Sequence, residues 1–406
     1  MQLGMRKSCL GGGQLSYQLA FINGSTLKAL RERRKVSSEY LCRKTGIKLN
    51  QLEVWEQGSG TDYPTMKQAE KMAKVLLSPL AGLYLEPCNL PVETVPVVVN
   101  KRRIQNACMV DESALHLAAY RLAQVRSDTI ALAAETGVTF HRFNLPKLNG
   151  TYADAAAIIR DWIGLSLDNQ KRTTSARKLF LALRTRLEER GALVAQFDGV
   201  EVEELRGLAL YFDELPIIGV NANDHWPAQC FTMLHELVHL SRRSSVYCNL
   251  VCMEADDEEE MFCNFVAGEF LFSRSCVEQE IRAGLNPRDL DSIERVSRRY
   301  SVSRDVVARR LRDYGYLDKC AYEDLLDIFA RQIAEEKEEQ RRRKEAGEKI
   351  GWPAPYERKV ADSLGSLYCE LVAQGLSFGL LSERDACSAF GVEAEKLGKV
   401  FKEALA

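Results

Sequence analysis

The chain lacks a long apolar run. No stretch of about 18 residues is apolar enough to cross a bilayer, so we expect no membrane-spanning helix. The N-terminal residues also lack the hydrophobic segment and cleavage site of a secretory signal peptide. The 12 cysteines do not show the paired spacing of a small disulfide-rich domain, and we therefore expect a protein of the reduced cytoplasm. Cys248 and Cys252 are four residues apart, but without a second cysteine pair they indicate a metal only weakly.

A dominant charge of either sign is missing as well. The 406 residues include 55 Lys and Arg against 57 Asp and Glu, which gives a formal net charge of -2. A strongly basic or acidic field over the whole chain is thereby excluded. The hydrophobic fraction of 46% is ordinary for globular proteins, and the length exceeds that of one compact core. We therefore expect about two or three domains.

Histidine is scarce, with five in the chain, yet two of them stand four residues apart in the motif His235-Glu236-Leu237-Val238-His239. Four residues make just over one helical turn, so both imidazoles project from one helix face and can bind one metal ion. Glu236 then lies beside the open coordination position. This is the arrangement of zinc peptidases. The alternative is an amphipathic helix whose two histidines are satisfied by hydrogen bonds in the core.

A catalytic zinc needs a third protein ligand besides its exchangeable water. The acidic residues 257–260 precede apolar residues at helical spacing, which predicts a helix that begins at the acidic run. Glu260 and Asn264 share one face of this helix, so the carboxylate can ligate zinc and the amide can orient a histidine ring. We interpret Glu258 and Glu259 as a solvated helix start.

Further segments accompany the histidine motif: residues 211–218 and Asn221 before it, Phe231-Thr232 leading into it, and residues 260–267 after it. With these segments, residues 205–273 resemble the ImmA/IrrE family of zinc metallopeptidases, bacterial and phage proteins that cut repressor-type transcription factors. The resemblance implies that His235, His239 and Glu260 bind Zn2+. Val238 stands where the family often has Gly or Ala, and it adds bulk without touching a ligand.

The implied mechanism is hydrolysis by a zinc-activated water, whose pKa zinc lowers to about 7. Glu236 would take the proton of this water and return it to the leaving amine. Residues 208–211 and 216–220 are predicted to form a strand, a turn and a strand, and such an edge strand can pair with an extended substrate. A place in the sheet core is the alternative, and both can hold together. Tyr211, His225 and Tyr247 are candidates for the oxyanion-stabilising group by proximity in sequence.

The N-terminal part predicts a helix from Glu39, capped by Ser37-Ser38 and ended by Gly46, and a second helix over residues 48–56. Residues 23–85 resemble the Xre/Cro-like helix-turn-helix domains that often precede this peptidase domain. Lys48, Asn50 and Gln51 are the candidate contacts to double-stranded DNA. A docking module for a partner protein is the alternative, because the second helix has few cations and Glu53 would repel phosphates.

A second helix-turn-helix-like stretch follows the peptidase segment, with helices predicted over residues 293–300 and 303–311 and Ser303 as a cap. Its arginines could touch nucleic acid or an acidic partner. We favour the interpretation that they form the solvated face of a helix pair packed on the core. These arginines are Arg298, Arg299, Arg304, Arg309, Arg310 and Arg312.

The fold class is expected to be multidomain, α plus α+β, with boundaries at Pro- and Gly-containing segments. We predict a tail (1–22), an all-helical helix-turn-helix domain (23–87), a linker (88–112), a zincin-like α+β metallopeptidase domain with a small antiparallel sheet (113–290), the second helix-turn-helix-like segment (291–318) and a helical C-terminal region (319–406). Further patterns predict helices over 113–136 and 174–190, a strand over 192–197 and an exposed charged helix or linker over 335–345.

Two functions stay open. The first is a zinc-dependent regulatory endopeptidase that hydrolyses a peptide bond in a repressor-type transcription factor or antitoxin-like partner, when a stress or phage signal exposes the site. The second is a DNA-binding transcriptional regulator whose zincin-like domain serves as a sensor or docking module without proteolysis.

Overall fold

The computed structural model describes residues 18–58, 60, 62–90, 95–100, 111–248, 258–348 and 355–404. Helices dominate this part of the chain, and five strands form one sheet. The chain divides into two compact units, one of residues 1–92 with 109–117 and one of residues 93–108 with 118–406. Two of the predicted parts fall partly outside the described residues. They are the tail, at residues 1–17, and the linker, at residues 91–94 and 101–110.

The first unit is helical. It contains α1 (Gly24–Arg33), α2 (Ser38–Thr45), α3 (Leu49–Gln57), α4 (Met66–Val75) and the 3-10 helices η1 (Leu80–Tyr84) and η2 (Pro87–Asn89). The two helices predicted after Ser37 are present as α2 and α3. Ser37 accepts a hydrogen bond from the backbone N–H of Tyr40, and Gly46 ends α2 in the left-handed conformation. The buried side chains between the helices include Leu27, Leu41, Leu52 and Met72.

The sheet lies in the second unit and has the order β1-β5-β3-β4-β2. Its strands are β1 (Val99–Asn100), β2 (Leu193–Phe197), β3 (Gly207–Leu210), β4 (Ile217–Asn221) and β5 (Val246–Cys248). β3 is antiparallel to β4 and β5, whereas β2 is parallel to β4 and β1 is parallel to β5. The prediction of an antiparallel sheet is therefore wrong, and the sheet is mixed. The local pattern identifies the β3–β4 hairpin, but the flanking strands come from distant segments whose direction no local pattern specifies.

The hairpin strands β3 and β4 lie inside the sheet, and β1 and β2 are its edges. The expectation of an edge strand in the hairpin is therefore wrong, and the sheet-core alternative holds. Every residue of β2, β3 and β4 is buried. Strands covered on both faces need apolar residues at successive positions, which these strands have except at Gln196 of β2 and Asn221 of β4.

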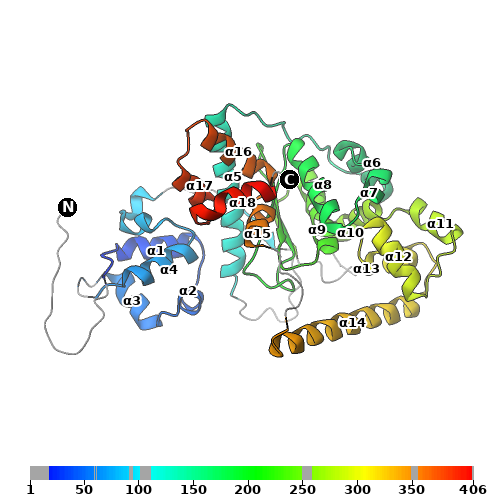
Figure 1. Ribbon diagram of the computed structural model, residues 1–406, viewed down its shortest axis with the longest axis horizontal. Helices are drawn as coiled ribbons and strands as arrows, with labels where there is room; N and C mark the ends of the chain where they lie inside the picture. The colour runs from blue at the N-terminus through cyan, green and yellow to red at the C-terminus, as the bar shows by residue number, and fades with distance from the viewer. Residues whose placement is uncertain are drawn as a thin grey trace. The chain divides into compact units, whose positions relative to one another are not determined.

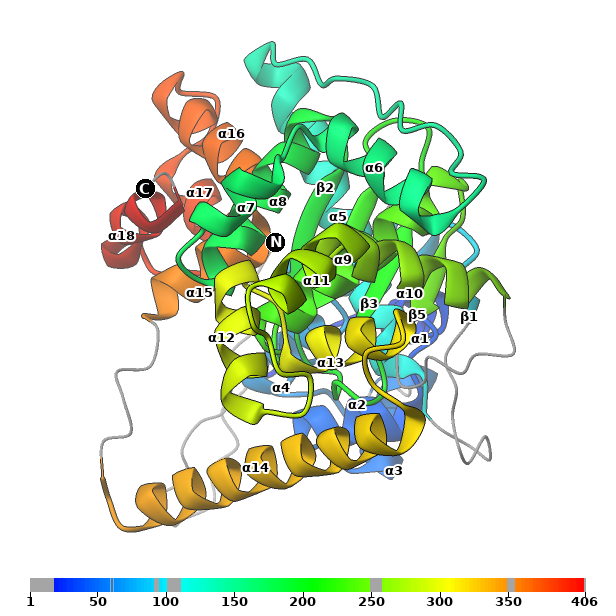
Figure 2. The same ribbon diagram turned by 90° about the vertical axis from the view of Figure 1, so that its right-hand side faces the viewer.

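The helix α9 (Trp226–Ser241) carries the histidine motif through the interior of the second unit. It packs against β3 and β4 and against the helices α8 (Ala176–Glu189) and α10 (Glu258–Leu271) (Figure 2). Residues 232–241 are all buried. A helix that is covered all round needs apolar residues on every face, which explains why leucine, methionine and valine surround the two histidines.

The remaining helices of this region are α5 (Ser113–Thr136), α6 (Tyr152–Ile163), α7 (Leu167–Arg172) and α11 (Arg274–Arg282). The predicted helices over 113–136 and 174–190 and the predicted strand over 192–197 are confirmed as α5, α8 and β2, with ends that differ by at most two residues. α6 packs along α10.

The two helices predicted after residue 290 are present as α12 (Leu290–Tyr300) and α13 (Arg304–Asp313), and Ser303 caps α13 by accepting a hydrogen bond from the Val306 N–H. The interpretation of a solvated arginine face fits Arg298, whose side chain is 79% exposed. It is wrong for Arg310, which is buried and forms an ion pair with Glu269 of α10. Because α13 packs on α10, an arginine on its inner face needs a buried partner.

The C-terminal region is helical, as expected. It contains α14 (Lys319–Glu345), α15 (Tyr356–Leu364), α16 (Ser366–Ser377), α17 (Glu383–Phe390) and α18 (Ala394–Ala404) (Figure 1). Residues 335–343 of the charged run lie in α14 and are largely exposed. α15 to α18 form a small bundle whose core also includes Leu132 of α5. Within the described ranges, no helix combines the length and apolarity that a bilayer span requires.

Candidate metal centre

The two histidines of the motif approach each other through one ring nitrogen each. Nε2 of His235 and Nε2 of His239 are 3.1 Å apart, and both side chains are fully buried. The four-residue spacing in α9 therefore places both imidazoles on one face, as the sequence predicts.

Glu260 lies in the first turn of α10 and contacts both histidines. Its Oε2 is 3.2 Å from Nε2 of His235, and its Oε1 is 3.1 Å from Nε2 of His239. Burial acts to raise the pKa of Glu260, but hydrogen bonds with the two imidazoles outweigh it and hold this pKa well below its usual value. The packing of α10 along α9 thus brings the predicted third ligand to the other two.

Asn264 follows Glu260 by one helical turn and supports the opposite side of the His235 ring. Its Oδ1 accepts a hydrogen bond from Nδ1 of His235 over 3.0 Å. An N–H at Nδ1 leaves the lone pair on Nε2, which is the tautomer that a metal ligand needs. This contact places Asn264 where the sequence predicts a supporting residue.

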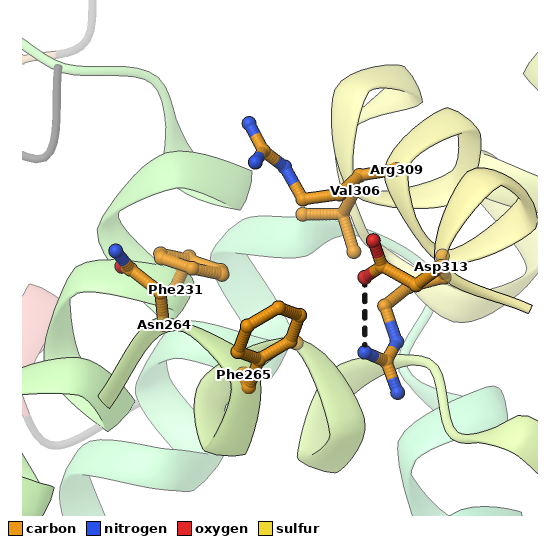
Figure 3. Close-up of a pocket in the computed structure, with 8 residues that line it drawn as sticks. Phe231, Asn264, Phe265, Val306, Arg309 and Asp313 are labelled. Atoms are coloured by element: carbon orange, nitrogen blue, oxygen red, sulfur yellow. Dashed lines mark hydrogen bonds and ion pairs between the residues drawn. The ribbon is translucent and has the colours of Figure 1, made fainter. Parts of the chain in front are cut away.

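A small pocket borders Asn264 (Figure 3). In this pocket Phe231, Asn264 and Phe265 face Val306, Arg309 and Asp313 of α13. His235, His239 and Glu260 are absent from its lining. The pocket therefore adjoins the residue that orients the His235 ring, and the three predicted ligands lie outside it.

Glu236, the predicted catalytic residue, is fully buried, and neither of its carboxylate oxygens has a hydrogen-bond partner among the described residues. Burial raises the pKa of this carboxyl to about 8. A buried carboxylate without partners is costly, and a nearby cation would both stabilise it and lower its pKa. The geometry around Glu236 is thus suited to a positively charged neighbour.

Gly207, the first residue of β3, makes room for Glu236. A Cβ atom at this position would lie 2.3 Å from Cγ2 of Thr232 and 2.6 Å from Oε1 of Glu236. Both distances are far below van der Waals contact, so a side chain there would displace the carboxylate. Gly207 is not among the site residues predicted from the sequence, although a glycine inside a strand often marks such a close approach.

Cys248, the last residue of β5, also reaches the histidines. Its Sγ is 3.6 Å from Nε2 of His239 and 4.0 Å from Oε1 of Glu260. The ligand atoms of Cys248 and of the three predicted ligands all lie within 4.8 Å of one another. Cys252, which the sequence analysis paired with Cys248, lies outside the described residues. The relevant partner of Cys248 is thus the histidine motif.

The other ring nitrogen of His239 faces α10. Its Nδ1 is 3.7 Å from Oε1 of Glu259 and 3.9 Å from Sγ of Cys263. The interpretation of a solvated helix start holds for Glu258, which is exposed, and is wrong for Glu259. Glu259 also lies 3.5 Å from Arg242, because the first turn of α10 packs onto the end of α9.

These residues fit a zinc ion. Imidazole nitrogen and carboxylate oxygen are among its ligands, and two such atoms bound to a tetrahedral zinc lie about 3.3 Å apart. Nε2 of His235 and Nε2 of His239 are 3.1 Å apart, and the two Glu260 oxygens each approach one of them, Oε1 at 3.1 Å from His239 and Oε2 at 3.2 Å from His235. The side chains thus stand at the separations that a shared metal requires.

The aromatic candidates for stabilising an oxyanion are placed differently from these ligands. His225 is the residue before the first turn of α9 and makes no capping hydrogen bond with its side chain; it lies ten residues, or about 15 Å, along the helix from His235. The hydroxyl of Tyr211 donates to Asp213 over 3.3 Å. Tyr247 is the neighbour of Cys248 in β5, and successive strand residues point to opposite faces, so its ring points away from the face that carries the Cys248 thiol.

The candidate DNA contacts belong to the first unit. Lys48 is the residue before the first turn of α3, and both Lys48 and Asn50 are exposed, whereas Gln51 is half-buried. Glu53 is exposed on the same helix. Glu56 is held inward by Arg31, whose Nε is 2.7 Å from Oε1 of Glu56. The negative charge of Glu56 is thereby neutralised.

Comparison with known protein families supports the peptidase interpretation of this region. Residues 199–312 match the model of peptidase family M78, described as the IrrE N-terminal-like domain. The match begins before β3 and ends in α13, so it includes all the residues of the candidate metal centre. It supports the resemblance to ImmA/IrrE metallopeptidases for this part of the chain. No curated protein and no solved structure matched the chain.

Proposed function

We propose that the chain is a zinc-dependent endopeptidase whose metal is held by His235, His239 and Glu260. The observation that carries the proposal is the contact of Glu260 with both histidines, at 3.1 and 3.2 Å, beside a buried glutamate. The M78 family match over the same residues supports it.

Glu236 acts as the general base in the proposed reaction. Bound zinc would supply a Lewis acid that activates a water and polarises the peptide carbonyl. Glu236 is the neighbour of His235 in α9 and makes no hydrogen bond to another described residue, so its carboxylate is free to take the proton of the attacking water. It then donates this proton to the leaving amine. Asn264 keeps Nε2 of His235 directed at the metal throughout.

The proposed substrate is a repressor-type transcription factor or an antitoxin-like protein in the cytoplasm, cut in response to a stress or phage signal. The helices α2 and α3 support a regulatory role, because two short helices joined by three residues, Gly46, Ile47 and Lys48, suit a helix-turn-helix of the Xre type. We propose Lys48, Asn50 and Gln51 of α3 as its contacts to double-stranded DNA. Exposure of Lys48 and Asn50 is compatible with this role.

The test compares the wild-type chain with the Glu236→Gln variant, which keeps the size of the side chain and removes the base. Both are expressed in cells, and newly formed protein N-termini are labelled and identified. We expect new N-termini in helix-turn-helix or antitoxin-like proteins with the wild type alone, while both chains retain zinc. Equal cleavage by both chains, or by neither once the stress or phage signal has been given, contradicts the catalytic proposal.

The second candidate is a DNA-binding regulator whose metal domain senses or docks a partner without proteolysis. The burial of all four residues, His235, Glu236, His239 and Glu260, favours it, because a substrate has to reach these groups. Control of a target promoter that persists in the Glu236→Gln variant, without new N-termini in any bound protein, would support this candidate.

A further inference from the structure

The cluster of potential ligands contains one more member than a hydrolytic zinc site uses. Such sites hold the metal with three protein side chains and leave a fourth position for water, whereas closed structural sites use four. Here the ligand atoms of His235, His239, Glu260 and Cys248 all lie within 4.8 Å of one another. A fourth side chain therefore lies close enough to occupy the coordination position that a hydrolytic site leaves to water.

The position of the thiol matches that of a ligand. A thiolate sulfur and an imidazole nitrogen on one tetrahedral zinc lie about 3.6 Å apart, because Zn–S bonds are roughly 2.3 Å and Zn–N bonds roughly 2.0–2.1 Å long. Sγ of Cys248 is 3.6 Å from Nε2 of His239. Its distance to Oε1 of Glu260, 4.0 Å, is slightly longer. The sulfur thus faces the nitrogen that would bind the metal.

The sheet holds Cys248 in this place. In the β3–β5 register Cys248 is opposite Gly207, and its carbonyl oxygen accepts a hydrogen bond from the Arg206 backbone N–H over 3.1 Å. Opposite residues in an antiparallel pair point to the same face. That face meets α9, since a Cβ at Gly207 would touch Thr232 and Glu236. Cys248 is 1% exposed, so its thiol points into the protein and has little contact with solvent.

We propose that Cys248 is a fourth metal ligand that closes the zinc centre and keeps the peptidase latent. Hydrolysis then requires the Cys248 sulfur to leave and a water oxygen to take its place, an exchange without change of oxidation state. This inference rests on the proposed function, because it takes His235, His239 and Glu260 as the ligands of the same metal. It adds that the resting site holds no hydrolytic water.

Cobalt in place of zinc tests the ligand set directly, since a thiolate bound to Co2+ gives an intense charge-transfer absorption in the near ultraviolet and nitrogen and oxygen ligands do not. The full-length chain is stripped of metal and titrated with Co2+. We expect the thiolate absorption in the wild type and its loss in Cys248→Ala and Cys248→Ser. Both substitutions are used because serine preserves the size of the side chain.

Cys263→Ala is the matched control. It removes a buried thiol that lies 3.9 Å from the other nitrogen of the same histidine, Nδ1 of His239, and we expect it to keep the absorption. Zinc affinity should fall by at least about 100-fold in Cys248→Ala, since loss of an outer-sphere partner alone costs roughly 10- to 100-fold. At saturating zinc, this variant should cleave faster than the wild type any protein whose new N-terminus depends on Glu236 in the Glu236→Gln comparison.

The outcomes separate the two proposals. If Co2+ binds to the wild type without the thiolate absorption, or if the absorption disappears in Cys263→Ala and persists in Cys248→Ala, the closed-site proposal is wrong while the three-ligand metal site stands. If the wild type binds neither Co2+ nor zinc, the proposed function itself fails.

Discussion

The candidate metal centre and the helix pair α2–α3 hold their candidate functional side chains in opposite ways. In the cluster, His235 and His239 are fully buried, and each touches Glu260 of another helix. On α3, Lys48 and Asn50 are exposed. The first set is positioned by the tertiary structure, whereas the second is positioned by one helix alone.

Because of this difference in burial, the cluster residues say more about their function than the exposed residues of α3 do. Burying imidazole, carboxylate and thiol groups together costs free energy unless they are paired or bind a cation, so such a cluster is a candidate metal site. Exposed lysine and asparagine side chains carry no such cost, and they are equally compatible with DNA, a partner protein or solvent. The burial of the cluster therefore favours metal binding, whereas only a binding experiment can identify the partner of α3.

The largest expected difference between the candidate metal centre and the helix pair α2–α3 is in their stabilisation by zinc. Zinc at a thousandfold excess over its Kd should stabilise the region that binds it by about 4 kcal/mol. We expect slower amide hydrogen exchange in α9 and α10 and unchanged exchange in α2 and α3, measured by mass spectrometry with zinc and with a chelator. Equal protection of both regions would show that the metal is not confined to the cluster.

Asn264→Ala should weaken zinc binding by roughly 10- to 100-fold, because the His235 ring loses the partner that fixes its tautomer. Asn50→Ala, the same change on an exposed helix of the other region, should leave zinc affinity unaltered. A competition titration against a chromophoric chelator measures both. Similar affinities in the two variants would mean that Asn264 does not support the ligand.

Gly207→Ala should lower the free energy of unfolding by about 1–3 kcal/mol and reduce cleavage, because the new Cβ collides with Thr232 and Glu236. Gly398→Ala is its control. A Cβ at this position in α18 meets nothing within 4 Å, and alanine should raise stability by up to about 1 kcal/mol. Urea unfolding measures both changes, and an unaltered stability in Gly207→Ala would refute the close approach.

The double substitution Lys48→Ala and Gln51→Ala should have the smallest effect on the fold, within about 0.5 kcal/mol, and none on zinc content. If α3 enters a DNA groove, the variant should bind a duplex selected by the wild type from a random pool about tenfold more weakly or worse, with a shallower salt dependence. Fluorescence anisotropy measures this. Failure of the wild type to select any duplex would favour the protein-docking alternative.

Much of the local structure could be predicted from the sequence. The caps at Ser37 and Ser303 and the left-handed Gly46 stand at the expected helix ends, because capping depends on neighbouring residues. The sheet could not be predicted to the same degree. Its mixed order depends on the way β1, β2 and β5, all outside the hairpin, pair around it, so the hairpin became interior.

For the candidate site, the spacing of His235 and His239, and of Glu260 and Asn264, was sufficient by itself, since helical periodicity alone places each pair on one face. Only the tertiary structure brought the two helices together and added Cys248, Glu259 and Gly207 to the site. These three contacts join α9 to a strand or helix outside it, and no local pattern encodes which distant side chain fills the space beside a buried histidine.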